Sequence, residues 1–169
     1  EVFTTASRVF NRDNPQAGTP FKVFTIGHRD EPFTARAGLP VLPEFSFENH
    51  PPVDLLIVPG GVVNAELKKP EVISWIASVA AGARLSASVC TGAFLLARAG
   101  LLDGKQATTH WEDIADLRRD FPKIEVLAGR HWIDAGDVVT SGGISAGIDM
   151  SLHLVERLAE RELAVKTAR

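Results

Sequence analysis

The chain has 169 residues, of which 45% are hydrophobic and 23% are charged, and its formal net charge is −3 at pH 7. This length and composition are typical of one globular domain with a well-formed core. The slightly negative charge gives no electrostatic reason to expect binding to nucleic acid or to an anionic membrane through this segment. A single cysteine excludes an internal disulfide framework, and the sequence has neither a signal-peptide pattern nor a long apolar run. The expected location is therefore the reducing cytoplasm.

Short apolar runs alternate with helical patterns along most of the chain. The segment rich in proline at 37–52 reads as a surface hairpin or excursion. Strands that alternate with helices and short loops predict an α/β fold, with a doubly wound, mostly parallel sheet sandwiched by helices. The predicted strands cover 21–26, 53–58, 83–89, 106–109, 124–127, 131–133 and 137–140, and the predicted helices cover 1–10, 71–81 with Pro70 in its first turn and Gly82 as its cap, 111–119, 145–158 and 162–169.

The first predicted element is a helix at 1–10 that has no capping residue and no strand before it. A doubly wound sheet normally begins with a strand, so the pattern predicts that a first strand and its loop are missing from the N-terminus. The predicted helix at 162–169 has no stop signal, which is typical either of a truncated C-terminus or of natural fraying.

Cys90 is the only cysteine, and it lies in Ser88-Val89-Cys90-Thr91-Gly92, where a strand-like run meets a helix-like run. A tight strand-to-helix turn exposes nucleophiles in α/β enzymes. The free N–H groups and the dipole of the next helix favour the thiolate over the thiol. The pattern predicts a reactive cysteine, and the alternative is a small buried hydrophobic residue.

Three further loops follow predicted strands and are expected at the same edge of the sheet, where open α/β sheets bind their ligands. Gly60 and Gly61 predict backbone N–H groups that point at a developing oxyanion, unless the pair serves only the shape of a turn. His110 is the candidate partner base, with Trp111 beside it, and a histidine satisfied by backbone groups is the alternative. The third loop contains Gly142.

Other cofactor chemistry has little support in the spacing of residues. The remaining histidines are not spaced as metal ligands, and the glycine pairs match neither a Walker motif nor a dinucleotide fingerprint. The sequence therefore predicts neither a metal nor a cofactor.

Four motifs in order resemble one superfamily over nearly the whole chain. The order is similar to that of the ThiJ/PfpI superfamily, which has the flavodoxin-like, class I glutamine amidotransferase-like fold. Cys-Thr-Gly at the elbow and Gly-Gly-Ile-x-Ala-Gly-Ile-Asp near the end resemble isonitrile hydratases and the sensor domains of AraC-type transcription regulators. Thr91 stands where the peptidase-like branch has histidine, which argues against proteolysis and against a Cys-His-Glu amidase mechanism. The motifs are Val58-Pro59-Gly60-Gly61, the elbow from Ser88 to Ala97, the run from Ala99 to Trp111, and Gly142 to Asp149.

The resemblance implies that 1–169 is a single ThiJ/PfpI-like domain with a cysteine-dependent hydratase or lyase activity. Cys90 would add to the terminal carbon of an isonitrile, and water would resolve the thioimidate to an N-substituted formamide. Thr91, Gly142 and Ile144 would shape the pocket. An acidic proton donor would come from a segment before Glu1.

The resemblance also implies a homodimer and leaves a second function open. That alternative is a ligand-sensing domain of an AraC-type transcription regulator. Its partner would be a small effector in place of a substrate, and a helix-turn-helix region after Arg169 would identify it.

Overall fold

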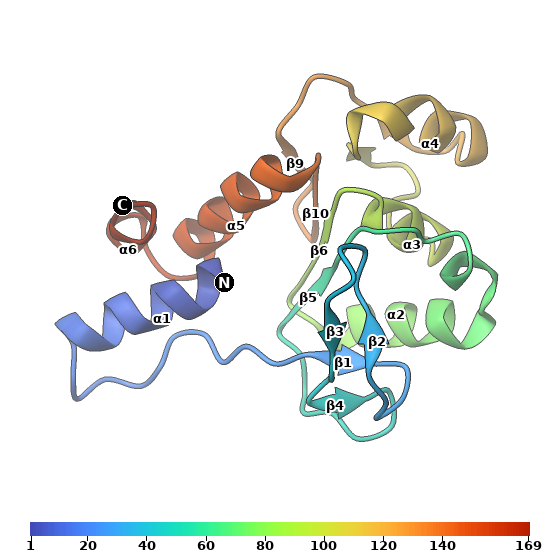
Figure 1. The fold of residues 1–169 in the computed structure, drawn as a ribbon. Coiled ribbons are helices and arrows are strands. Elements are labelled where there is room, and N and C mark those ends of the chain that lie inside the picture. Colours follow the sequence, from blue (N-terminus) through green and yellow to red (C-terminus); the bar gives the residue numbers. More distant parts are fainter.

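The computed structural model describes all residues, 1–169, and has an α/β fold (Figure 1). None of its helices is both long and apolar enough to cross a membrane. The helices are α1 (Val2–Asp13), α2 (Pro70–Gly82), α3 (Gly92–Arg98), α4 (Ile114–Asp120), α5 (Ile144–Leu158) and α6 (Arg161–Thr167), with short 3-10 helices at η1 (Glu66–Lys68) and η2 (Trp111–Asp113). The strands are β1 (Ile26–Gly27), β2 (Phe33–Thr34), β3 (Pro40–Val41), β4 (Phe45–Ser46), β5 (Leu55–Val58), β6 (Leu85–Val89), β7 (Gln106–Ala107), β8 (Glu125–Val126), β9 (Trp132–Asp134) and β10 (Val138–Ser141).

The main sheet has four strands in the order β5-β6-β10-β9. β6 runs parallel to both β5 and β10, whereas β9 pairs with β10 antiparallel. Ser88 of β6 lies opposite Val58 on one side and Thr140 on the other. The strand that leads into Cys90 is therefore flanked on both sides, which fixes the position of its carboxyl end.

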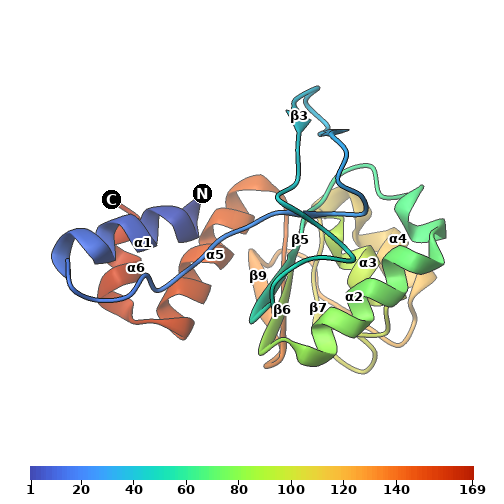
Figure 2. The same ribbon diagram turned by 90° about the horizontal axis from the view of Figure 1, so that it is seen from below.

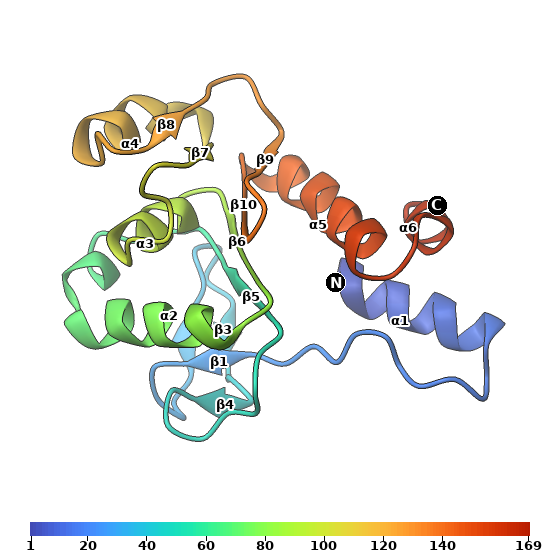
Figure 3. The ribbon, with the colours of Figure 1, turned by 180° about the vertical axis from the view of Figure 1, so that it is seen from behind.

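Helices cover both faces of this sheet, because successive strand residues point to opposite sides. Leu56 and Val58 pack with α2, α3 and α4 in one hydrophobic core. Leu85 and Val139 pack with α1, α5 and α6 in the other. Figures 1 and 3 show α2 and α3 on one side of the strands and α5 with α1 and α6 on the other. The predicted doubly wound architecture is confirmed.

The predicted strand at 21–26 is wrong. Only Ile26–Gly27 forms a strand, and it pairs with Phe45–Ser46 outside the main sheet. Residues 21–25 link α1 to β1 without a strand partner (Figure 2). Phe21 packs on a helix instead, since the rings of Phe21 and Phe3 lie 5.3 Å apart between centroids. The outer edge of β5 has no strand partner.

Smaller differences separate the expected elements from the observed ones. The predicted strand at 106–109 is reduced to Gln106–Ala107 and pairs with β8 in a separate two-stranded sheet. The hairpin predicted within 37–52 lies earlier, between β2 and β3, while β4 pairs with β1. Gly82 is the last residue of α2, and Ala83 follows in an extended conformation, so the expected glycine cap does not form.

Candidate active site

The elbow after β6 holds Cys90 in a strained conformation. Its φ is 56°, and it is the only residue other than glycine with a positive φ. Such a conformation costs about 1–3 kcal/mol and persists only where the surroundings enforce it. The N–H of Cys90 donates to the carbonyl oxygens of Ser141 and Gly142, each at 3.1 Å. The hydroxyl of Thr109 donates to the Cys90 carbonyl at 2.9 Å, so the turn is held on both sides.

Two glycines allow neighbouring backbone to pack directly against this elbow. A Cβ at Gly60 would lie 2.7 Å from the Cβ of Cys90 and 3.0 Å from the backbone nitrogen of Thr91. A Cβ at Gly92 would collide with the carbonyl oxygen of Val58, at the end of β5. Any side chain at either position would push the β5 loop or α3 away from Cys90.

Thr91 ties the elbow to the loop after β5. Its hydroxyl donates to the carbonyl oxygen of Gly61 at 2.8 Å and accepts the Gly61 N–H at 2.9 Å. The Gly61 N–H, expected as an oxyanion donor, is therefore occupied by Thr91. The N–H groups of Gly60 and Thr91 donate to no group of the protein, and both lie beside Cys90. The expectation of an oxyanion donor at this elbow therefore rests on the N–H groups of Gly60 and Thr91.

His110 lies beside the elbow loops but not in a hydrogen bond with Cys90. Its Nδ1 is 3.5 Å from a carboxylate oxygen of Glu112 and equally far from one of Asp113. Its ring packs so closely on Gly143 that a Cβ there would lie 2.7 Å from Cδ2. The expected pairing of thiol and imidazole is not formed in this structure.

The other predicted pocket residues divide into two groups. Gly142 belongs to the elbow, because its carbonyl accepts the N–H of Cys90. Trp111 and Ile144 are 76% and 88% exposed, so they lie on the surface and not in an enclosed pocket. Cys90, Thr91 and the glycine loops thus come together, whereas the two large apolar side chains remain open to solvent.

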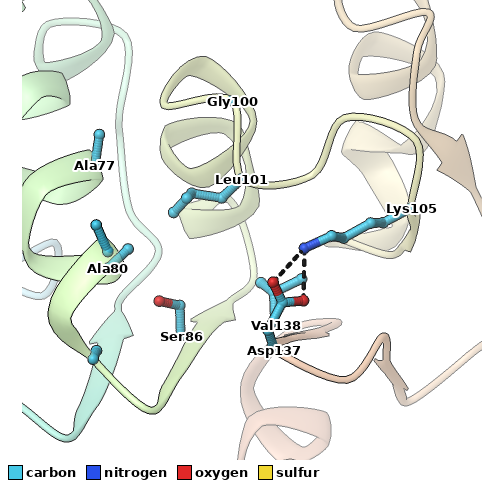
Figure 4. A pocket seen from close by; sticks show the side chains of 10 residues that line it. Ala77, Ala80, Ser86, Gly100, Leu101, Lys105, Asp137 and Val138 are labelled. Carbon is cyan, nitrogen blue, oxygen red and sulfur yellow. Dashed lines mark hydrogen bonds and ion pairs between the residues drawn. The ribbon is translucent and has the colours of Figure 1, made fainter.

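A groove lies at the opposite end of the sheet (Figure 4). It has a volume of about 430 Å³ and is lined by small side chains, with Ser86 and Val138 at the starts of their strands. Lys105 Nζ bridges both carboxylate oxygens of Asp137 there, at 2.6 and 2.7 Å. No group of three or more His, Cys, Asp and Glu side chains is placed to hold a metal ion.

The elbow, the glycine loops and the layered sheet agree with what a family comparison finds. Residues 1–157 match the family model described as the DJ-1/PfpI family. The chain belongs to the DJ-1/PfpI family. The resemblance to the ThiJ/PfpI superfamily is thereby confirmed.

Curated relatives of this DJ-1/PfpI chain include an enzyme and transcription regulators. The chain is 41% identical over 128 residues to an isonitrile hydratase from Pseudomonas putida, covering 75% of this chain and 55% of that protein. It is 38% identical over 130 residues to the HTH-type transcriptional regulator GbdR of Pseudomonas aeruginosa, covering 77% of this chain and 35% of the regulator. The chain thus spans only about half of the first relative and about a third of the second.

A solved structure supports the same fold. The crystal structure of a ThiJ/PfpI family protein from Pseudomonas syringae superimposes with a TM-score of 0.78 at 30% identity. The match covers 86% of this chain and 60% of that one.

Some residues of this DJ-1/PfpI site were not found by reasoning from the sequence. The sequence places Thr109 at the end of a predicted strand before His110 and Ser141 in a glycine loop, and neither position by itself indicates a contact with Cys90. Both contact Cys90 through hydrogen bonds across the sheet. For Thr109 the available signal is a hydroxyl side chain at the predicted ligand-binding edge, whereas Ser141 contacts Cys90 through its backbone carbonyl, which no residue type indicates.

Proposed function

We propose that this DJ-1/PfpI domain catalyses the cysteine-dependent hydration of a small uncharged molecule of the isonitrile class. The observation that carries the proposal is the strained Cys90 elbow, beside which the N–H groups of Gly60 and Thr91 have no partner within the protein. Strain of this kind is concentrated at active sites. The 41% identity to an isonitrile hydratase supports the choice of substrate class.

In the proposed reaction the Cys90 thiolate adds to the terminal carbon of R–N≡C, and that carbon takes up a proton to give a thioimidate, Cys–S–CH=N–R. Water then adds to the same carbon and protonates the nitrogen. Collapse of the adduct expels the thiolate and releases R–NH–CHO, so one water is consumed for each turnover. The N–H groups of Gly60 and Thr91 would stabilise negative charge as it develops beside Cys90.

The test is an assay of an aromatic isonitrile for release of the formamide, together with mass spectrometry of the protein during turnover. We expect wild type to release formamide and to gain the mass of one isonitrile at Cys90. Cys90→Ala should do neither while keeping its far-UV circular dichroism. Formamide release by Cys90→Ala at the wild-type rate would contradict the proposal.

A second candidate function is ligand sensing as part of a transcription regulator. The 38% identity to GbdR favours it. A sensing domain must bind its ligand but need not convert that ligand to a product. Thermal stabilisation by a small molecule without consumption of that molecule would support sensing over hydration.

A further inference from the structure

Thr109 contacts the candidate nucleophile through its hydroxyl group. It follows β7, whereas Cys90 follows β6, so the tertiary fold alone brings the two together. The Thr109 side chain is almost completely enclosed, with the residue only 2% exposed. Its Oγ1 lies 2.9 Å from the carbonyl oxygen of Cys90, which it can reach only as a donor.

The hydrogen bond from the Thr109 hydroxyl holds the carbonyl group of Cys90, whereas the end of β10 holds its N–H. The N–H of Cys90 is secured by the carbonyls of Ser141 and Gly142 at the end of β10. The carbonyl of Cys90 receives the Thr109 hydroxyl at 2.9 Å and the N–H of Ala93 at 3.3 Å. The shorter of these two bonds is thus supplied by a side chain.

We infer that Thr109 is a positioning residue, which keeps Cys90 in its left-handed conformation and thereby keeps the sulfur aimed at an incoming electrophile. The inference rests on the proposed function, because it assumes that Cys90 reacts. Thr109 itself forms no bond to the substrate and transfers no proton in the proposed steps.

The neighbouring residue provides a matched control. Thr108 is 1% exposed, and its hydroxyl donates to the carbonyl of Leu127 at 2.8 Å. Thr108 and Thr109 are therefore adjacent, equally buried and engaged in hydrogen bonds of nearly equal length. Only the bond of Thr109 reaches Cys90.

The experiment compares wild type with Thr109→Val, Thr109→Ser and Thr108→Val. Because Cys90 is the only cysteine, the rate of iodoacetamide alkylation from about pH 5 to about pH 9 reports that residue alone. Loss of one hydrogen bond corresponds to about a 3- to 10-fold slower reaction in Thr109→Val. Thr109→Ser should restore the rate, and Thr108→Val should react like wild type.

A second measurement reads the backbone directly. Selective ¹³C labelling of cysteine yields one set of Cα, Cβ and carbonyl resonances, whose shifts report the conformation of Cys90. We expect these shifts to move toward ordinary values in Thr109→Val and to stay unchanged in Thr108→Val. Thr109→Ala repeats both measurements if the valine variant does not fold.

Different results would overturn the proposed function and the positioning role of Thr109. A wild-type Cys90 that reacts no faster in the folded protein than in the unfolded chain overturns the proposed function, and this inference with it. A reactive wild-type Cys90, combined with equal rates and equal cysteine shifts in Thr109→Val and Thr108→Val, overturns the inference about Thr109 alone.

Discussion

At the scale of the residue, the elbow is crowded by backbone as much as by side chains. Gly60 lies so close to Cys90 that a methyl group has no room between them. Its N–H is also one of the two donors near Cys90 that have no partner within the protein. The same glycine therefore serves both the packing and the proposed chemistry of the site.

Gly60→Ala is expected to reduce both stability and the alkylation rate of Cys90. The added Cβ would lie 2.7 Å from the Cβ of Cys90, and overpacking of this kind costs about 1–3 kcal/mol. Chemical denaturation and iodoacetamide kinetics measure the two effects. Gly82→Ala is the control, since a Cβ there meets nothing within 4 Å and alanine favours a helix. Unchanged alkylation in Gly60→Ala would mean that this contact does not shape the elbow.

Thr91→Val is expected to destabilise the protein by about 1–3 kcal/mol. The substitution removes both hydrogen bonds to Gly61 and leaves a partly buried N–H and carbonyl without partners. Thr91→Ser keeps the hydroxyl and should recover most of the loss. Urea denaturation of the three proteins is the measurement, and equal midpoints for the valine and serine variants would show that the hydroxyl is not needed.

At the scale of the element, one carboxylate fastens α5 to the edge strand β9. Asp134 accepts hydrogen bonds from His153 Nε2 at 2.7 Å and from Arg157 Nη1 at 2.9 Å. Burial acts to raise the pKa of Asp134, but the bonds from His153 and the Gly136 N–H and the charge of Arg157 outweigh it, so the pKa is lowered. The ionised form of this carboxylate therefore stabilises the fold.

Asp134→Asn should lower stability in a pH-dependent way. Because the folded-state pKa lies below the unfolded value of about 3.9, the contribution of Asp134 is complete above that value. It is lost as the pH falls through the folded-state pKa. Denaturation of wild type and variant from about pH 2 to about pH 7 should show their difference shrinking at the acid end. Glu156→Gln, on the same helix but in no ion pair, is the control, and a constant difference for Asp134→Asn would refute the assignment.

At the scale of the whole molecule, two hydrophobic cores share one sheet. Leu96 is fully buried in the core beside α2 and α3, and Leu154 is fully buried in the core beside α1 and α6. Val58 and Ile57 are neighbours in β5 but pack toward opposite cores. The two cores are thus joined through the strands and not separated into two units.

Leu96→Ala and Leu154→Ala should each lower the free energy of unfolding by about 2–5 kcal/mol and leave a single transition. Leu42→Ala, at an exposed position, should change it by less than about 0.5 kcal/mol. Calorimetry with circular dichroism detects whether the transitions coincide. A separate early transition in Leu154→Ala would show that α1, α5 and α6 unfold independently.

The homodimer implied by the resemblance remains a prediction. Ile144 and Trp111 are large apolar side chains exposed beside the elbow loops. Analytical ultracentrifugation of wild type and of Ile144→Glu tests whether these exposed side chains mediate association. A monomeric wild-type protein at all concentrations would contradict the expectation.

Much of the fold could be predicted from local patterns. Leu55–Val58, Leu85–Val89 and the long helix Ile144–Leu158 all lie where the sequence predicts them, because each segment has a local pattern of apolar residues that is bounded by turn residues. The strand predicted at 21–26 failed for a reason that local patterns cannot reveal. An apolar extended segment can pair with a strand or pack on a helix, and here Phe21 packs against Phe3 of α1.

The candidate site, like the fold, could be predicted from the sequence only in part. The sequence alone determined the family resemblance, the strand-to-helix elbow and the choice of Cys90, since these depend on residue types and spacing along a short stretch. Only the tertiary structure decided that Thr91 occupies the Gly61 N–H and that Thr109 donates to the Cys90 carbonyl. The physical reason is that a hydrogen-bond donor takes whichever acceptor the packed sheet brings within about 3 Å, and that choice joins residues far apart in the chain.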